Sequence, residues 1–124
     1  MTYHTRSITG QVSYRAGLSA EATVARHYEN LGYQMQETRW RGEAGEIDLI
    51  MRDGDRLVFV EVKKSRSFAY AAQNLSARQI ARIYATAEEY LGLMPAGQLT
   101  EARFDLGMVD GLGQIEVLEN AFGL

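Results

Sequence analysis

The sequence predicts an α/β domain in which a central mixed β-sheet is flanked by helices. Apolar residues recur at helical spacing over residues 17–31 and 77–91, and five further segments have the apolar pattern of strands. The order helix, three strands, helix, two strands is packed most economically with a helix on either side of one sheet. The chain has 124 residues, 46% of them hydrophobic, and can therefore bury one core without metal or disulfide cross-links.

The first expected element is a helix over residues 17–31, which follows a polar, aperiodic arm of residues 1–16. Gly32 is well placed to end this helix, since glycine adopts the left-handed backbone conformation common at that position. We expect residues 17–124 to form a single domain. One side of the helix carries a stripe made of Leu18, Glu21, Ala25 and Tyr28.

Three strands are expected next, over residues 33–40, 46–52 and 56–62. Asp53-Gly54-Asp55 separates the last two, and an Asp-Gly pair between apolar strands is a strong signal for a hairpin. If Asp53 and Gly54 form a two-residue turn, Arg52 pairs with Asp55. A three-residue turn would instead reverse which side chains share a face.

The second helix is expected over residues 77–91, because Ser76 and Gln79 have the spacing of a capping box and Gly92 can end the helix. Residues 64–75, which precede it, are polar and aromatic, and we interpret them as a loop. Two final strands are expected over residues 102–109 and 114–118.

The composition excludes several classes of function. The absence of cysteine rules out a disulfide framework, a thiol nucleophile and a zinc finger. No segment resembles a signal peptide or approaches the ~20 apolar residues of a membrane span, so we expect a cytoplasmic protein without a membrane partner. Residues 1–82 hold 12 lysine and arginine residues against 9 acidic ones, while residues 83–124 hold 1 against 7. The first part could present a basic surface, and a solvated surface of mixed charge is the alternative.

Charged residues interrupt the two central strands at positions that are otherwise apolar. Because side chains alternate along a strand, Glu46 and Asp48 share one face of residues 46–52. Glu61 and Lys63 share one face of the next strand in the same way. In the expected register Glu46 lies opposite Glu61, and Asp48, opposite Phe59, is the diagonal neighbour of Glu61. Their Cα atoms would be about 7–8 Å apart, so both carboxylates could reach one ion.

A patch of three carboxylates needs a proton or a cation. Like charges about 5 Å apart repel by roughly 3 kcal/mol at an effective dielectric constant of 20. Oxygen ligands without nearby histidine favour Mg²⁺ or Mn²⁺, which can hold a phosphate oxygen and lower the pKa of a bound water. Lys63 could orient that water or neutralise charge on the phosphate. The pattern is typical of an enzyme that cleaves phosphodiester bonds. In the structural alternative, Glu61 and Lys63 form ion pairs with Arg52 or Glu46 at a sheet edge.

Glu21 lies on the apolar stripe of the first helix, where an unpaired carboxylate would be costly to bury. We expect it to point toward the acidic face of the sheet, as a metal ligand or as a group that holds a metal-bound water. Glu21, the segment GEIDLI at 45–50 and the segment FVEVK at 59–63 resemble the YraN family of bacterial proteins. That family, whose function is not established, is placed in the PD-(D/E)XK restriction-endonuclease-like superfamily. The resemblance covers residues 17–105.

The resemblance implies a restriction-endonuclease-like fold and a role for each acidic residue. In that superfamily an aspartate at the end of one strand and a Glu-X-Lys on its neighbour bind magnesium and cleave a phosphodiester bond. Archaeal Holliday-junction resolvases, which are similar, add a glutamate from the first helix. Catalytic roles carried over in this way fall on Glu21, Asp48, Glu61 and Lys63. The implied ligands of Mg²⁺ or Mn²⁺ are Asp48, Glu61, Glu21 and Glu46.

Basic residues near this pattern are candidate contacts to nucleic acid, with DNA favoured over RNA. They are Arg41, Lys64, Arg66 and Arg78. Phe68 and Tyr70 could stack on an unpaired base, and a flexible surface loop is the alternative for that segment. Arg78 stands where many relatives have lysine. Trp40, beside Arg41, is expected to pack in the core.

Three functions remain open from the sequence. The leading hypothesis is a magnesium-dependent endonuclease that hydrolyses phosphodiester bonds in DNA, including branched or junction DNA. Because the domain is too small to wrap a duplex, a homodimer could present two sites. The alternatives are a non-catalytic nucleic-acid-binding module of the same fold and a protein-interaction scaffold.

Overall fold

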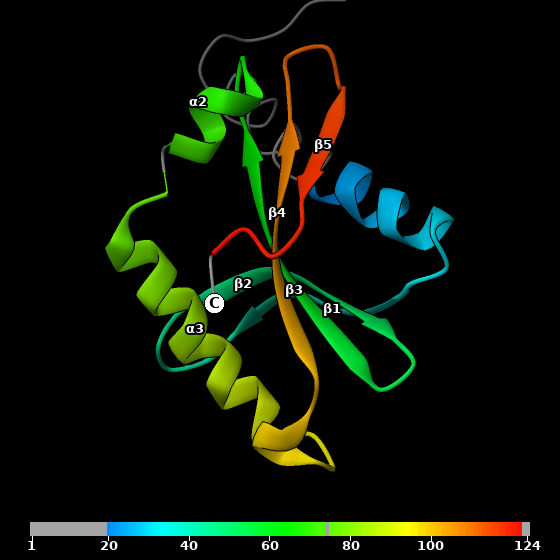
Figure 1. Cartoon of the computed structure of the whole chain (residues 1–124), viewed down its shortest axis with the longest axis vertical. Coiled ribbons are helices and arrows are strands. Elements are labelled where there is room, and N and C mark those ends of the chain that lie inside the picture. Colours follow the sequence, from blue (N-terminus) through cyan, green and yellow to red (C-terminus); the bar gives the residue numbers. More distant parts are fainter. Residues whose placement is uncertain (1–19, 74, 123–124) are drawn as a thin grey trace, which may run out of the picture.

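The computed structural model describes residues 20–73 and 75–122, and its centre is a five-stranded mixed β-sheet (Figure 1). The strands lie in the sheet in the order of the chain. β3 and β4 are parallel, and the other neighbouring pairs are antiparallel. The strands are β1 Gln34–Arg41, β2 Glu46–Asp53, β3 Arg56–Lys64, β4 Ala102–Val109 and β5 Ile115–Leu118. The predicted α/β class is confirmed, and the arrangement is consistent with a restriction-endonuclease-like fold.

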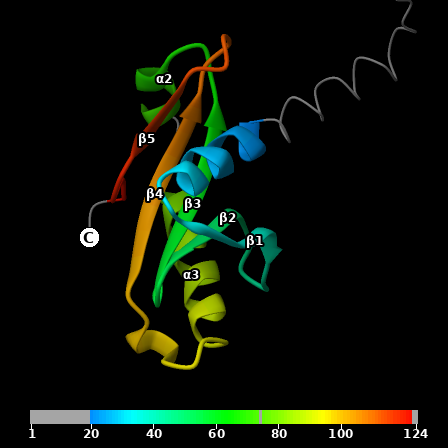
Figure 2. The same cartoon turned by 90° about the vertical axis from the view of Figure 1, so that its right-hand side faces the viewer.

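Helices cover both faces of this sheet. The N-terminal helix, residues 20–30 of the described chain, and α3 (Ala77–Leu91) lie on opposite sides of the strands (Figures 1 and 2). The expected arm of residues 1–16 and the expected helix start at residue 17 lie outside the described residues. Across residues 20–73 and 75–122, no helix has the length and apolar character needed to cross a membrane.

Two apolar clusters attach the helices to the sheet. The cluster under the N-terminal helix joins apolar residues of that helix, β2 and β3, among them Val24, Ala25, Tyr28, Leu49, Met51, Val58 and Val60. The cluster under α3 uses the other side of the same strands, with Ile47, Ile50, Leu57, Phe59, Ala87, Tyr90 and Leu91. Burial on both faces explains why the sequence of these two strands is almost continuously apolar.

α3 begins and ends where the sequence predicts. The Ser76 hydroxyl accepts a hydrogen bond from the Gln79 backbone N–H at 3.1 Å, and the Gln79 side chain accepts one from the Ser76 N–H at 3.0 Å. The predicted capping box is therefore confirmed. Gly92 follows the last turn, and its N–H donates to the Glu88 carbonyl. The predicted strand bounds agree with the structure to within two residues.

The prediction of a loop over residues 64–75 is wrong in part, because this segment contains the short helix α2 (Phe68–Gln73). The Ser67 hydroxyl accepts the Tyr70 backbone N–H at 3.1 Å, which satisfies one of the free donors at the start of the helix. Phe68 and Ala71 pack in a small cluster with Leu106 and Met108 of β4. Six residues are too few for a helical period to stand out in the sequence, so packing against β4 decides the conformation. A 3₁₀ helix, η1 (Gly97–Leu99), was not predicted either.

The turn between β2 and β3 lies one residue later than predicted. Asp53 pairs with Arg56, so Gly54 and Asp55 form the two-residue turn, and Gly54 has a φ of +63°. Glycine tolerates this conformation at the first turn position. Asp53 and Arg56 then face each other, and their side chains form an ion pair at 3.0 Å.

A buried charge network ties β4 to the N-terminal helix and to the end of the chain. Asp105 is fully buried and accepts hydrogen bonds from the Tyr28 hydroxyl at 2.7 Å and from the Asn120 backbone N–H at 3.0 Å. The Arg103 guanidinium donates two more, each at 2.9 Å. Because the carboxylate is paired and hydrogen-bonded, its burial is tolerated, and this network is structural.

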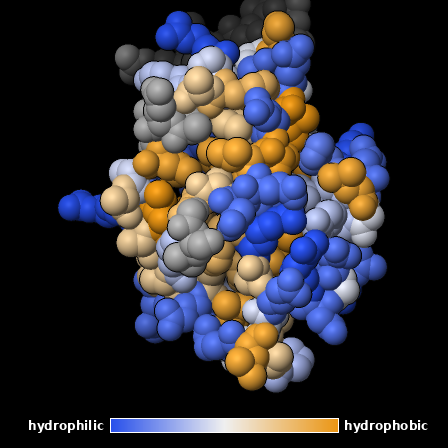
Figure 3. Space-filling model, viewed as in Figure 1, coloured by the Kyte–Doolittle hydropathy of each residue, from blue (hydrophilic) through white to orange (hydrophobic). Residues whose placement is uncertain are grey.

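Large apolar side chains that remain exposed are spread over many parts of the chain. They are Leu31, Met35, Tyr70, Leu93, Leu99, Leu112 and Leu118. On the face seen in Figure 3, apolar and hydrophilic side chains are intermixed. Scattered exposed apolar residues of this kind are normal for a folded protein and do not by themselves indicate a docking surface.

Candidate functional site

The β2–β3 hairpin brings Asp48 and Glu61 into contact. The observed register pairs Leu49 with Val60, which places Asp48 opposite Glu61 rather than opposite Phe59 as predicted. The predicted register is wrong by two residues, but a shift of two residues leaves each side chain on the same face. Asp48 raises the pKa of the Glu61 carboxyl group, so the two side chains lie close together on one face, as expected.

β2 departs from a regular strand around Asp48. Ile47 and Ile50 contact the same cluster under α3, although strict alternation would place residues three apart on opposite faces. The pairing of β1 with β2 passes over Arg39 and Asp48, and Arg39 has a φ of +50°. The Asp48 carboxylate instead accepts the backbone N–H of Val62 at 2.8 Å. The pairing of β1 with β2 is therefore irregular at Asp48, and the Asp48 carboxylate acts on Glu21 of the N-terminal helix.

Glu61 is the most perturbed acid of the site. Burial, together with the neighbouring Asp48 carboxyl group, raises the pKa of Glu61 to about 9. The Lys63 ammonium, 3.8 Å from the Glu61 carboxylate, lowers this pKa, and Glu21 raises it slightly. The raised pKa favours a protonated Glu61 carboxyl group beside Asp48 at neutral pH.

Glu21 joins this pair from the N-terminal helix, as predicted. Its side chain is only 15% exposed and lies 3.5 Å from the Arg39 guanidinium. Burial raises the pKa of Glu21, with a further contribution from the Asp48 charge, while Arg39 lowers it. The three carboxyl groups that the sequence places on a helix and two strands thus interact electrostatically in the folded chain.

Glu46 lies at the outer side of this group. It is 3.9 Å from Arg39 and 4.0 Å from Arg41, and its side chain is 35% exposed. Glu46 also acts on the pKa of Glu21, although it contributes less than Asp48 or Arg39. Within residues 20–73 and 75–122, no three acidic or histidine side chains converge on one point closely enough to hold a metal ion as they stand. The predicted acids are assembled as neighbours, and a metal cage would require their side chains to turn inward.

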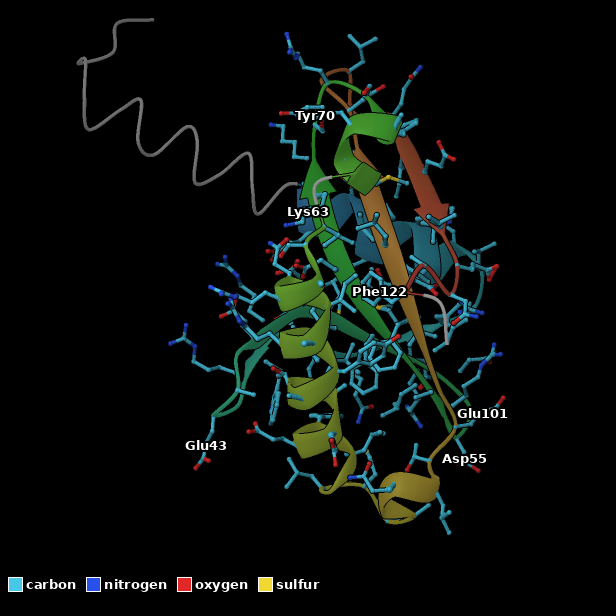
Figure 4. The ribbon with its side chains drawn as sticks, turned by 60° about the vertical axis from the view of Figure 1, so that its left-hand side comes forward. Glu43, Asp55, Lys63, Tyr70, Glu101 and Phe122 are labelled. Carbon is cyan, nitrogen blue, oxygen red and sulfur yellow. The ribbon has the colours of Figure 1, made fainter. Side chains whose placement is uncertain are left out.

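The predicted nucleic-acid contacts are exposed and come from four elements. Arg41 ends β1, Lys64 ends β3, Arg66 precedes α2, and Arg78 lies in the first turn of α3. Figure 4 shows Lys63 and Tyr70 on the same part of the chain, where β3 leads into α2, and Tyr70 is 58% exposed.

Two aromatic residues from the sequence analysis are packed inside. Trp40 is partly buried and meets Tyr90 edge to face, with ring centroids 5.0 Å apart, so its predicted packing role is confirmed. Phe68 is part of the cluster under α2, so in this structure it packs against the domain. Of the two aromatic residues considered for base stacking, only Tyr70 has an exposed side chain.

The sequence analysis did not assign Arg39 to the acidic group, and the ion pairs of Arg39 with Glu21 and Glu46 were therefore missed. Arg39 lines a groove of about 370 Å³ that runs between the N-terminal helix and β1. Glu21, Arg26 and Thr38 are also in the lining. The segment Thr38-Arg39-Trp40-Arg41 holds two basic residues just before GEIDLI, which is the signal that could have suggested a counter-ion. A separate groove of about 590 Å³ lies at the other end of the hairpin, next to η1.

A sequence profile described as "Uncharacterised protein family UPF0102" matches residues 20–109. The chain belongs to the UPF0102 family. A UPF0102 protein of Cereibacter sphaeroides (strain ATCC 17025) is 56% identical over 115 residues, which is 93% of this chain and 98% of the relative. A UPF0102 protein of Ruegeria pomeroyi is 55% identical over 92% of this chain and 93% of its own length. A UPF0102 protein of Roseobacter denitrificans is 53% identical over 90% of this chain and 87% of its own length.

Membership of UPF0102 confirms the resemblance to the YraN family and leaves the reaction open, because the family is described as uncharacterised. The matched stretch contains all the acids of the candidate site and Lys63. β5 and the segment around Asn120 lie beyond it. The relatives nevertheless cover most of this UPF0102 chain.

Proposed function

We propose that this UPF0102 protein is a magnesium-dependent endonuclease that hydrolyses phosphodiester bonds in nucleic acid, with DNA favoured over RNA. The observation that carries the proposal is the register that sets Asp48 opposite the part-buried Glu61, with the Lys63 ammonium 3.8 Å from Glu61. A part-buried pair of carboxyl groups beside an amine is typical of functional sites, because a structural role alone seldom justifies its cost. The resemblance to PD-(D/E)XK enzymes and to archaeal resolvases supports the same reaction.

The residues present fit a hard divalent cation. The donors are carboxylate oxygens from Glu21, Asp48, Glu61 and Glu46, and oxygen donors of this kind suit Mg²⁺ or Mn²⁺. The raised pKa of Glu61 beside Asp48 marks a place where positive charge is favoured. When bound, the cation would supply a water of lowered pKa and would neutralise charge on the phosphate.

Each residue of the site has a distinct task in the proposed reaction. Asp48 is held in place by the Val62 N–H and would keep its carboxylate directed at the cation. Glu61 would lose its proton and become the second ligand. Lys63, whose side chain is 27% exposed, would orient the attacking water or neutralise the charge that develops on the phosphate. Glu21 would hold a metal-bound water or serve as a further ligand.

Exposed basic and aromatic side chains would bind the substrate in the proposed reaction. Arg41, Lys64, Arg66 and Arg78 are exposed and would contact phosphates, and Tyr70 would stack on an unpaired base. We include branched or junction DNA among the substrates, a homodimer as the form that presents two sites, and the cytoplasm as the location.

A second candidate function is a nucleic-acid-binding module that does not cleave. It is favoured by one observation, that no three acids of the described ranges converge into a ready metal cage. In that case Glu61 would keep its proton, and the basic residues would bind nucleic acid without metal.

Metal titration and cleavage assays separate these candidates. Calorimetry with Mg²⁺ and Mn²⁺ would compare the wild type with Asp48→Asn and Glu61→Gln, and with Glu116→Gln as a control on an exposed strand position. We expect the wild type and the control to bind and the other two variants to lose affinity at least tenfold. Labelled single-stranded, duplex, flapped and four-way-junction DNA would then be incubated with each protein and with Lys63→Met. Metal-dependent cutting that Lys63→Met abolishes supports the enzyme, whereas binding without cutting at any metal concentration refutes it.

A further inference from the structure

Arg39 lies between two of the acidic side chains that the proposed function assigns to the metal. Its Nε atom is 3.5 Å from a carboxylate oxygen of Glu21 and 3.9 Å from one of Glu46. These two glutamates come from the N-terminal helix and from β2, so one guanidinium links the helix to the strand. The Glu21 side chain is 15% exposed and that of Arg39 is 42% exposed. The contact is therefore partly shielded from water, where a charge pair is stronger than on an open surface.

The backbone at Arg39 is unusual as well. Its φ of +50° lies in the left-handed region, which is unfavourable for a residue with a long side chain. The residue occupies β1 at the position, opposite Asp48, that the pairing with β2 passes over. An outlier of this kind is retained when the surrounding structure overdetermines it, and such outliers cluster at functional sites. The conformation and the ion pairs together place the guanidinium in the acidic group.

We propose that Arg39 is a built-in counter-ion that holds Glu21 and Glu46 in the metal-free protein and competes with the divalent cation for them. The inference rests on the proposed function, because it names what the cation must displace. It also explains why the acids lie next to one another without converging. A carboxylate directed at Arg39 is not directed at the pair formed by Asp48 and Glu61.

The structure provides a place for Arg39 to go. The groove of about 370 Å³ is lined by Arg39, Glu21 and Thr38 and by Arg26 of the N-terminal helix. A guanidinium released from the glutamates stays at the rim of this groove, beside the site where the phosphate is cleaved. Arginine binds phosphate oxygens through two parallel hydrogen bonds, so the released side chain becomes a ligand for the backbone of the nucleic acid. One residue would thereby couple the arrival of the cation to the binding of substrate.

The test compares Arg39→Gln with Arg39→Lys and Arg41→Gln. Arg39→Lys keeps the positive charge and Arg39→Gln removes it. Both variants have a long side chain at the same backbone position, so the backbone strain is matched. Arg41 is a matched control, because it contacts Glu46 at 4.0 Å but is 79% exposed and does not contact Glu21 among the ion pairs of the described chain. Affinity for Mg²⁺ and Mn²⁺ would be measured by calorimetry at pH 8.5 and constant ionic strength. We expect Arg39→Gln to bind about tenfold more tightly than wild type, and the two controls to stay within about threefold.

A second measurement requires no metal. Urea unfolding in chelating buffer would be compared for wild type, Glu21→Gln, Arg39→Gln and the double variant. We expect Arg39→Gln to lower the free energy of unfolding in the wild-type background. It should have little effect on that free energy when Glu21 is already glutamine. If Arg39→Gln binds metal with unchanged or weaker affinity, Arg39 does not compete with the cation. If Arg39→Gln lowers the free energy of unfolding equally with Glu21 and with glutamine at position 21, Arg39 is not the counter-ion of Glu21. If no protein binds metal, the proposed metal site fails, and the unfolding cycle still decides whether Arg39 holds Glu21.

Discussion

Replacing Glu61 by glutamine should change how the stability of the metal-free protein depends on pH. In the folded chain burial and Asp48 raise the pKa of Glu61 to about 9, whereas the ordinary value is 4.5. Between these values the folded state holds a proton that the unfolded state has released. The free energy of unfolding contributed by this group therefore falls as pH rises through that window, and is largest below pH 4.5. Glutamine mimics the protonated acid and cannot ionise, so Glu61→Gln should remove this fall.

The size of the change in the free energy of unfolding follows from the difference between the folded and unfolded pKa of Glu61. Each unit of pKa difference corresponds to about 1.4 kcal/mol, so the wild type should lose up to about 4 kcal/mol between pH 5 and pH 8 through this group alone. The Glu61 side chain is 15% exposed and lies near Lys63, and reorientation toward the ammonium and water reduces the loss. We therefore expect Glu61→Gln to be more stable than wild type at pH 8 by about 2–3 kcal/mol, and to match it near pH 5.

Urea unfolding followed by circular dichroism at half-unit steps from pH 5 to pH 8.5, in chelating buffer, would measure the difference. Glu116→Gln is the control, since it removes an exposed strand carboxylate. Adding Mg²⁺ should selectively stabilise the wild type at high pH, because the cation binds the ionised form. Parallel pH profiles for wild type and Glu61→Gln would refute the account of a part-buried, protonated Glu61 beside Asp48.

Other substitutions test the framework that carries the site. Asp105→Asn should cost about 3 kcal/mol or more in urea unfolding, because it removes the buried charge partner of the part-buried Arg103 guanidinium, whose other ion pair is with the exposed Glu119. A loss under about 1 kcal/mol, the size of a surface effect, would contradict this. Ser76→Ala should cost about 1 kcal/mol through loss of the cap of α3, and Ser76→Asp should retain most of the stability. Gly107→Ala should cost about 1–3 kcal/mol, since its Cβ would lie 2.7 Å from a methyl group of Val24. An unchanged melting temperature would mean that the N-terminal helix can shift without loss.

Much of the local structure could be predicted because the responsible interactions lie within a few residues. The capping box at Ser76 depends only on Gln79, three residues away. The apolar periodicity of residues 77–91 arises because one face of this helix packs against the sheet. The shared face of Glu61 and Lys63 follows from alternation along one strand. Local rules were weaker at the hairpin, where both Asp53-Gly54 and Gly54-Asp55 are acceptable turns and the ion pair of Asp53 with Arg56 accompanies the second.

The acidic residues and their order along the chain were determined by the sequence alone, and so was their assignment to one helix and two strands. The tertiary structure decided how they meet. The register placed Asp48 opposite Glu61, the packing of the N-terminal helix brought Glu21 near Asp48, and Arg39 came between Glu21 and Glu46. The physical reason is range: periodicity and capping act over a few residues, whereas burial and charge act between segments that only the folded chain brings within a few ångströms.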